Sequence, residues 1–165
     1  MKFFKNLNLP LVAIVFAASL VAAVVFTVSR QTTKSSDILV ATTRLENRRL
    51  PASALGQINE EKFLLVYLTS RCGACSDELD LLSELKASSP GLKIFGIMGE
   101  EESVVKNYIM DNDINFPIIS DRNLDVLRNL RLEFFPTNLA IKNGLIEKAY
   151  LGPPEKGELL ALISD

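Results

Sequence analysis

An apolar run that stops at a closely spaced pair of cysteines constrains this chain more than any other feature. The run, Phe63–Leu68, has the length and the β-forming residues of a buried strand. Cys72 and Cys75 follow it, and from Cys75 onward apolar residues repeat at helical spacing as far as Leu85. The pattern predicts that Cys72 lies where a buried strand gives way to a helix.

This position favours a reactive sulfur at Cys72. The first turn of a helix has unpaired backbone N–H groups and the positive end of the helix dipole, and both stabilise an anion. A thiolate is such an anion, so this setting is expected to lower the pKa of Cys72 below the ordinary value of a cysteine. Cys75, about one turn further along, is expected to be less exposed and to attack a mixed disulfide held on Cys72. We therefore interpret the pair as a redox site.

Three other roles of a close cysteine pair compete with redox chemistry. A zinc site would need further ligands, but the sequence has no histidine and only two cysteines, so one chain cannot complete a tetrahedral site of nitrogen and sulfur ligands. A C-x-x-C-H haem attachment fails because Ser76 follows Cys75. A purely structural disulfide stays open, although a loop this short removes little entropy from the unfolded chain.

The composition fits one compact domain with an accessory segment. The chain has 165 residues, of which 48% are hydrophobic, and this is enough for a single core. Its formal net charge is -2, and no block of basic residues occurs. It therefore lacks the electrostatic pattern of a nucleic-acid-binding protein.

The N-terminal segment predicts a membrane anchor. Residues 1–8 contain two lysines and no acid, and residues 9–28 are apolar without a charge. At the helical rise such a run spans about 30 Å, the thickness of the hydrocarbon core. A cleaved signal peptide is the alternative, but residues 24–26 extend the apolar run past the small residues where cleavage would occur. We expect a short cytoplasmic N-terminus over residues 1–8 and a single transmembrane helix over residues 9–28.

A polar stretch follows the predicted anchor. Residues 29–50 are expected to form a linker that holds a domain, residues 51–165, away from the bilayer. Basic residues lie on both sides of the apolar run, so the positive-inside rule is nearly balanced. We expect the C-terminal domain to lie outside the cytoplasm, on the periplasmic side of the cell membrane.

Strands and helices alternate along the predicted domain. Strands are predicted over residues 63–68, 92–98, 116–119, 137–141 and 145–151, and helices from the cysteine pair to about residue 88 and over residues 101–110, 123–130 and 155–163. Asn143-Gly144 between the last two strands is a strong hairpin signal. The βαβαβα-ββα order predicts an α/β fold with a central mixed sheet and helices on both faces. Residues 50–59 are expected to hold a short strand or turn.

Several separated motifs, taken in order, resemble one family. They are Cys72-Gly73-Ala74-Cys75 after a strand, Glu78 one turn later, Asn115–Asp121, Phe135-Pro136-Thr137 before a strand, Asn143-Gly144 and Tyr150-Leu151-Gly152. Residues 51–165 are similar to the TlpA-like, membrane-anchored thiol-disulfide oxidoreductases. The resemblance implies a thioredoxin-like fold and a redox-active cysteine pair. An N-terminal anchor and an extracytoplasmic domain also agree with the family pattern.

The resemblance assigns a role to Pro136. In the family, the matching proline forms a cis peptide bond beside the cysteine pair, and the backbone of its neighbour pairs with the substrate chain. A proline tolerates the cis form at a cost of only about 0.5 to 1 kcal/mol, and exposed backbone groups can pair with an extended peptide. Without the resemblance, an ordinary trans proline at the start of a strand would be the simpler interpretation.

Glu78 has two interpretations. On a helix it lies one turn past Cys75 on nearly the same face, where a partly buried carboxylate could take the proton of Cys75. The resemblance supports this role, because the family's matching glutamate tunes the cysteines and because Val66 stands where thioredoxin has a buried aspartate. The alternative is a solvated glutamate on a helix surface.

Three residues depart from the family pattern. Arg71 replaces the usual tryptophan, so that a cation precedes the cysteine pair and either stabilises a thiolate or points to water. Ala74 replaces a frequent proline between the cysteines, which leaves the redox potential open. Lys142 stands where an acid is common, and we attach no meaning to this change.

We predict a membrane-tethered protein-disulfide reductase. Cys72 attacks a disulfide of an extracytoplasmic protein substrate, Cys75 resolves the mixed disulfide, and a membrane thiol-disulfide electron donor reduces the pair again. The cysteine pair is the redox group, and no metal, organic cofactor or nucleic acid is expected. The alternatives are a disulfide oxidase or isomerase, a thiol peroxidase, whose Pro-x-x-x-Thr/Ser-x-x-Cys loop fails at Leu65, and an anchored binding module without enzymatic activity.

Overall fold

The computed structural model describes residues 18–27, 38 and 40–163, and the chain divides into two compact units, Met1–Val40 and Ala41–Asp165. In the first unit, residues 18–27 are helical. Most of the predicted anchor lies outside the described residues, and among those described no helix is both long and apolar enough to cross a membrane. The anchor therefore stays a prediction.

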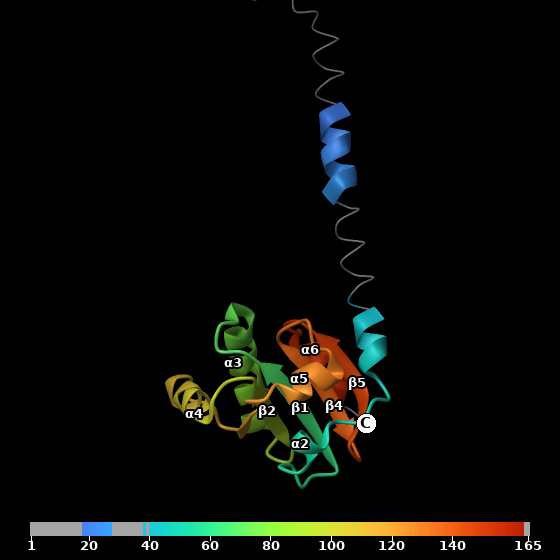
Figure 1. Ribbon diagram of the computed structural model, residues 1–165. Coiled ribbons are helices and arrows are strands. Elements are labelled where there is room, and N and C mark those ends of the chain that lie inside the picture. Colours follow the sequence, from blue (N-terminus) through green and yellow to red (C-terminus); the bar gives the residue numbers. More distant parts are fainter. Residues whose placement is uncertain (1–17, 28–37, 39, 164–165) are drawn as a thin grey trace, which may run out of the picture. The chain divides into compact units, whose positions relative to one another are not determined.

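The second unit is built on a five-stranded mixed sheet with the strand order β3-β2-β1-β4-β5 (Figure 1). The strands are Lys62–Leu68 (β1), Ile94–Met98 (β2), Ile118–Ser120 (β3), Thr137–Lys142 (β4) and Leu145–Leu151 (β5). β1 is parallel to β2, and β2 to β3, whereas β4 is antiparallel to both β1 and β5. Every residue of β1 after Lys62 is buried, as expected for a central strand that is covered on both faces.

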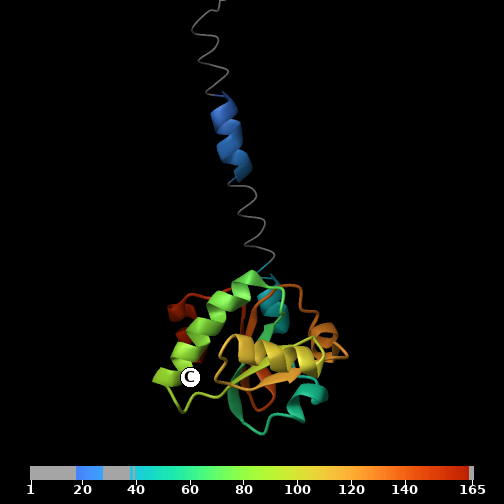
Figure 2. The same ribbon diagram turned by 90° about the vertical axis from the view of Figure 1, so that its left-hand side faces the viewer.

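Helices cover both faces of this sheet. They are Ala52–Leu55 (α2), Gly73–Ser88 (α3), Glu102–Asp111 (α4), Asp125–Leu130 (α5) and Lys156–Ile163 (α6). Side chains of α3, α4 and α6 share one apolar core with Leu64 and Val66 of β1, and Figure 2 shows α3 and α4 in front of the sheet. On the other face, Tyr67 of β1 donates a hydrogen bond to Asp121. Asp121 in turn accepts hydrogen bonds from the first backbone N–H groups of α5. The predicted mixed sheet with helices on both faces is thus confirmed.

The start and end of α3 follow from the local sequence. Cys72 is the N-cap residue, and its Sγ accepts a hydrogen bond from the backbone N–H of Cys75 at 3.2 Å. The buried face of the helix repeats at helical spacing and consists of Cys75, Glu78, Leu79, Leu82 and Leu85. The helix ends at Ser88 before Pro90, which disfavours the helical conformation in the residue before it.

The closing hairpin is confirmed, and the segment before β1 adds a short helix to the turn expected there. Asn143 and Gly144 join β4 to β5 with φ angles of 51° and 75°, and positive values are what a two-residue hairpin turn needs. Residues 50–59, expected to hold a short strand or turn, contain the short helix α2 followed by a turn at residues 56–57. The backbone pairs with the sheet just before this segment, at Arg49, which forms an isolated bridge with Leu145 of β5.

Residues 41–50 belong to the second unit, although the sequence predicts them as the end of a linker. Leu45 and Leu50 are buried, with exposed fractions of 3% and 2%. Arg48 donates hydrogen bonds from its guanidinium to the carbonyl oxygens of Leu130, at 3.2 Å, and Asn129. This stretch is therefore packed against the domain rather than free of it.

Candidate active site

The two cysteines form a disulfide bond where β1 gives way to α3. Their Cα atoms are 5.3 Å apart. Cys75 is fully buried in the apolar core, whereas Cys72 is only partly buried, as the helical spacing predicts. Cys72 is therefore the more accessible member of the pair.

The surroundings of Cys72 favour negative charge on its sulfur. The Sγ atom accepts the N–H of Cys75 and lies at the N-terminus of the 16-residue helix α3, where the dipole is positive. Arg71 is exposed beside it and adds a cation. When the disulfide is reduced, the same N–H group and dipole stabilise a thiolate at this position.

Glu100 holds the loop that leads into the cysteine pair. One carboxylate oxygen, Oε1, accepts hydrogen bonds from the backbone N–H and the hydroxyl of Ser70, both at 2.9 Å. The other oxygen, Oε2, is buried and has no partner among the described residues. Sequence reasoning missed this contact, because Glu100 follows β2 and nothing in the local sequence links it to Ser70.

The segment before β4 contacts the core on which Cys72 also packs. The Phe135–Pro136 peptide bond is cis, as the family resemblance implies, and Pro136 is buried. The ring of Phe135 lies 5.7 Å from that of Tyr67 in β1 and packs against the same core as Cys72. Among the described residues, no backbone hydrogen bond reaches Phe135.

Glu78 is buried behind Cys75 rather than solvated on the helix surface. Its exposed fraction is 2%, and neither carboxylate oxygen has a hydrogen-bond partner in the described part of the chain. Burial raises the pKa of the Glu78 carboxyl from 4.5 to about 8, because the charged form loses its hydration. In the oxidised protein near neutral pH, this carboxyl therefore holds a proton next to the buried sulfur.

Asn138 enters the same core from the sheet. It lies opposite Val66 in the pairing of β1 with β4, and directly opposite residues point to the same face of a sheet. That face carries the core under α3. Asn138 is fully buried, and both polar atoms of its amide lack a partner among the described residues. Sequence reasoning missed Asn138, because only the strand register brings it to Glu78.

The other face of the sheet has a buried carboxylate of a different kind. Asp121 accepts the hydroxyl of Tyr67 at 3.0 Å and the backbone N–H groups of residues 125–127 at the start of α5. It therefore caps a helix, since the N-cap residue Leu124 has no side chain for that task. The pKa of Tyr67 is raised by burial and by the negative charge of Asp121.

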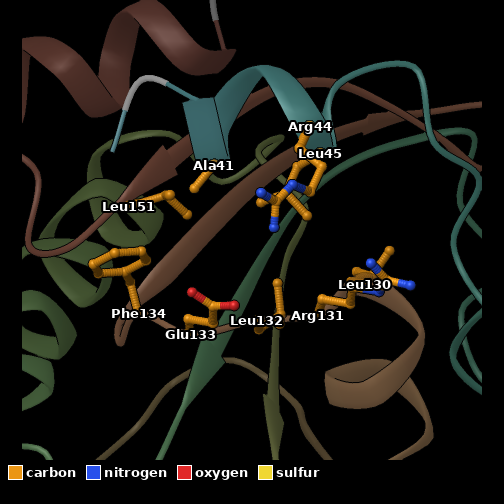
Figure 3. A pocket seen from close by; sticks show the side chains of 9 residues that line it. All are labelled: Ala41, Arg44, Leu45, Leu130, Arg131, Leu132, Glu133, Phe134 and Leu151. Carbon is orange, nitrogen blue, oxygen red and sulfur yellow. The ribbon is translucent and has the colours of Figure 1, made fainter. Parts of the chain in front are cut away.

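A small pocket lies between residues 41–45 and the loop after α5, and neither cysteine lines it. Figure 3 shows Arg44 and Leu45 on one side of it and Leu132 and Glu133 on the other. Its volume of about 10 Å³ holds at most about one water molecule. Among the described residues, no three side chains of Cys, Asp or Glu gather where they could hold a metal ion.

The chain is similar in sequence and structure to known thiol-disulfide oxidoreductases. It is 25% identical over 121 residues to thiol-disulfide oxidoreductase ResA of Bacillus cereus, and the match covers 71% of this chain and 68% of that protein. It is 27% identical over 100 residues to sporulation thiol-disulfide oxidoreductase A of Bacillus subtilis, covering 56% of this chain and 61% of that protein. The crystal structure of StoA from Bacillus subtilis matches with a TM-score of 0.55 and 26% identity, over 62% of this chain and 81% of StoA.

The fold, the disulfide and these relatives define a thioredoxin-like thiol-disulfide oxidoreductase. The chain belongs to the AhpC/TSA family, whose model matches residues 39–148. The resemblance to the TlpA-like enzymes is confirmed, and the redox group of this class is the cysteine pair itself.

Proposed function

We propose that this protein is a membrane-anchored reductase of disulfides in extracytoplasmic proteins. The observation that carries the proposal is the asymmetry of the cysteine pair. Cys72 is accessible at a helix N-terminus, whereas Cys75 is buried next to the protonated carboxyl of Glu78. An outer nucleophile and an inner resolving thiol with its own proton acceptor are what stepwise disulfide exchange requires.

The exchange proceeds in two balanced steps. The Cys72 thiolate attacks one sulfur of a substrate disulfide, forms a mixed disulfide and releases the other substrate sulfur as a thiolate. Cys75 then loses its proton and attacks the Cys72 sulfur, which releases the second substrate sulfur and leaves the Cys72–Cys75 disulfide. The substrate has gained two electrons, and a dithiol donor must return two electrons to the pair.

Glu78 is the proposed proton acceptor and donor for Cys75. A carboxyl whose pKa is raised to about 8 has a proton affinity close to that of an ordinary thiol, so the proton moves between them at little cost. When the donor reduces the disulfide, the leaving Cys75 thiolate takes the proton of Glu78. When Cys75 attacks the mixed disulfide, the Glu78 carboxylate takes the proton back.

The Pro136 segment is the proposed contact with the substrate chain. The Phe135 ring lies against Tyr67 near the end of β1, which leads into the Cys72 loop. The backbone groups of Phe135 have no partner in the described part of the chain. An extended peptide beside Cys72 can therefore pair with them, in the way that peptides add to exposed backbone groups elsewhere.

The apolar run over residues 9–28 supports membrane attachment. In its described part, several large apolar side chains are 55% to 66% exposed in the helix: Leu20, Val21, Val24, Val25 and Phe26. A helix with such a surface is favourable in lipid and unfavourable in water. We propose that this segment holds the domain on the outer side of the cell membrane, where a membrane thiol-disulfide donor supplies electrons.

Trapping with Cys75→Ser tests the reductase proposal. The full-length variant cannot resolve a mixed disulfide, so substrates and donor are expected to remain covalently bound to Cys72 and to separate only in reducing gels. Cys72→Ser is the matched control and should trap nothing, because Cys75 is buried. Recovery of disulfide-containing partners by Cys75→Ser alone supports the proposal; equal trapping by both variants, or by neither, contradicts it.

Glu78→Gln tests the proton transfer. The change keeps the size of the side chain but removes the proton acceptor, so reduction of a disulfide substrate at neutral pH should fall well below the wild-type rate. The rate should also lose the part of its pH dependence that Glu78 causes. An unchanged rate and pH profile would remove the catalytic role of Glu78.

Protease accessibility tests the location. Added protease should digest the C-terminal domain in intact spheroplasts that express the full chain, while a cytoplasmic marker protein stays intact. Protection of the domain until the membrane is broken would contradict the proposed orientation.

Two alternative functions, a disulfide oxidase and a thiol peroxidase, predict different experimental results. A disulfide oxidase of the same fold would trap partners that become oxidised, whereas a reductase traps partners that become reduced. A thiol peroxidase would consume peroxide through Cys72. The proline that its loop requires is replaced by Leu65, which is buried in β1, so we expect no such consumption.

A further inference from the structure

A buried polar pair lies beneath the cysteine pair. Glu78 of α3 and Asn138 of β4 are 2% and 0% exposed. The two carboxylate oxygens and both amide atoms lack a hydrogen-bond partner of normal geometry among the described residues. Buried polar atoms are almost always partnered in folded proteins, because an unpaired one loses its hydration without compensation. Four such atoms lie in one core, and Glu78 is on the buried face of α3 that also carries Cys75.

The two side chains face each other across the core. Asn138 shares its sheet face with Val66 and Ala140, and α3 packs on that face through Cys75 and Leu79. Asn138 also lies close enough to Glu78 to stabilise its charged form and lower its pKa against the effect of burial. In this conformation no hydrogen bond of normal geometry joins them.

We infer that Asn138 is a positioning residue that partners Glu78 in both protonation states and thereby sets the pH at which Glu78 exchanges a proton with Cys75. The inference rests on the function proposed for Glu78. An asparagine amide suits this task, because it carries both donors and an acceptor. Its Nδ2 group donates to the Glu78 carboxylate, and after rotation of the amide its Oδ1 accepts from the protonated carboxyl.

Few other titratable groups face Glu78. On α3, Cys75 is its proposed proton partner, while Asp77 and Asp80 are exposed. Tyr150 of β5 lies opposite Asn138, but its hydroxyl is hydrogen-bonded to the carboxylate of Glu158. Burial together with this carboxylate raises the pKa of Tyr150 to about 12. Tyr108 of α4 also packs against this core, and burial raises its pKa. Both tyrosines stay neutral over the working range, so among the described residues Asn138 is the polar side chain that can respond to Glu78.

A titration of the full-length oxidised protein tests the inference directly. The Glu78 side-chain carbon and the Asn138 side-chain amide are followed by NMR from about pH 5 to pH 10 in isotopically labelled protein. In the wild type both signals should move with one shared midpoint. A flat Asn138 amide signal, while Glu78 titrates, would overturn the inference without any mutation.

Asn138→Leu removes both hydrogen-bonding groups at similar size. The Glu78 midpoint should rise by about one pH unit, a tenfold change in proton affinity, and the pH profile of disulfide reduction should shift upward with it. Thr137→Val is the matched control: Thr137 is equally buried in the same strand, but its hydroxyl donates to the carbonyl oxygen of Phe134. This control should leave the Glu78 midpoint unchanged, and an unmoved midpoint in Asn138→Leu overturns the inference.

The double variant separates this inference from the proposed function. In a Glu78→Gln background, Asn138→Leu should no longer shift the pH profile, because Asn138 acts through Glu78. A shift that persists in that background contradicts the inference. If Glu78→Gln alone leaves the reduction rate unchanged, the proposed role of Glu78 fails, while the NMR titration still decides whether Asn138 partners Glu78.

Discussion

Two buried carboxylates lie on opposite faces of the same sheet, and their surroundings differ. Glu78 and Asp121 are 2% and 7% exposed. Asp121 accepts hydrogen bonds from the Tyr67 hydroxyl and from three backbone N–H groups at the start of α5. Neither oxygen of Glu78 has a partner within the described part of the chain. The fold thus surrounds one carboxylate with hydrogen-bond donors, whereas among the described residues the other has only the Asn138 amide near it.

The difference separates a structural group from a reactive one. Burying a charge is unfavourable unless hydrogen bonds replace its hydration, and Asp121 receives that replacement from the backbone. Glu78 does not, so its pKa rises to about 8 and its proton becomes exchangeable near neutral pH. The unsatisfied carboxyl lies one helical turn from Cys75, whereas the satisfied one connects α5 to β1. Its position near Cys75 and its lack of backbone hydrogen-bond donors therefore both identify Glu78, rather than Asp121, as the reactive carboxyl.

The largest expected effect is a change of the free energy of unfolding with pH, which Glu78 causes. Its pKa is raised from 4.5 to about 8 in the fold, so the folded state binds a proton that the unfolded state has lost over this range. The free energy of unfolding should therefore fall as pH rises from 4.5 to about 8, by up to roughly 5 kcal/mol. Glu78→Gln should lack this loss. Urea unfolding of the oxidised full chain at several pH values measures the difference between the two proteins.

Equal pH dependence in wild type and Glu78→Gln would show that Glu78 is not held protonated by the fold. Other carboxylates titrate in both proteins, so only the difference between the two curves is informative. Oxidised protein is used throughout, because Cys75 cannot then exchange a proton with Glu78.

The second effect concerns the satisfied carboxylate. Asp121→Ala leaves three backbone N–H groups, of which that of Val126 is buried, and the Tyr67 hydroxyl without their acceptor, and should lower the free energy of unfolding by about 3 kcal/mol. Asp121→Asn keeps one acceptor oxygen and should cost less. Neither change should shift the pH profile of disulfide reduction. A shift of that profile in Asp121→Asn would break the division into structural and reactive groups.

Much of the fold can be predicted from the sequence, because its strands are continuous apolar runs. β1 and β2 are such runs, the Asn143-Gly144 pair marks the hairpin, and the leucines after Cys75 repeat at helical spacing. The segment before β1 is less predictable. Leu45 and Leu50 are isolated apolar residues in a polar stretch, with no periodicity, and only the finished surface of the domain provides the place where they pack.

The site is predictable only where its residues are close in sequence. Cys72, Cys75 and Glu78 lie on one helix, so their spacing alone brings them together. Asn138 and Glu100 reach the site through pairing between distant elements, and a polar residue in a strand or loop carries no local sign of that contact. Whether the unpartnered carboxyl is buried also depends on tertiary packing, which is why the sequence alone leaves both interpretations of Glu78 open.

Glu100 is intermediate between the two carboxylates and gives a third, smaller effect. One of its oxygens binds Ser70, and the other is buried without a partner among the described residues. Glu100→Ala should lower the free energy of unfolding by roughly 1 to 2 kcal/mol and loosen the loop before Cys72. In the reduced protein, the rate of Cys72 alkylation should then change, while Ser70→Ala, which keeps the backbone N–H bond, should change it less. Identical alkylation rates in all three proteins would exclude a positioning role for Glu100.

The smallest effect is expected for Tyr67→Phe, and it sharpens the comparison further. The change removes the hydroxyl donor of Asp121 but leaves its backbone donors and the ring contact with Phe135. Unfolding should become easier by only about 1 kcal/mol, because the carboxylate remains partnered and no cavity forms. The corresponding change on the other face, Asn138→Leu, removes the neighbour of an unpartnered carboxyl and should act on proton affinity instead. If Tyr67→Phe moved the pH profile of reduction as strongly as Asn138→Leu, proton control would extend to both faces of the sheet, and hydrogen-bond satisfaction would no longer distinguish the two carboxylates.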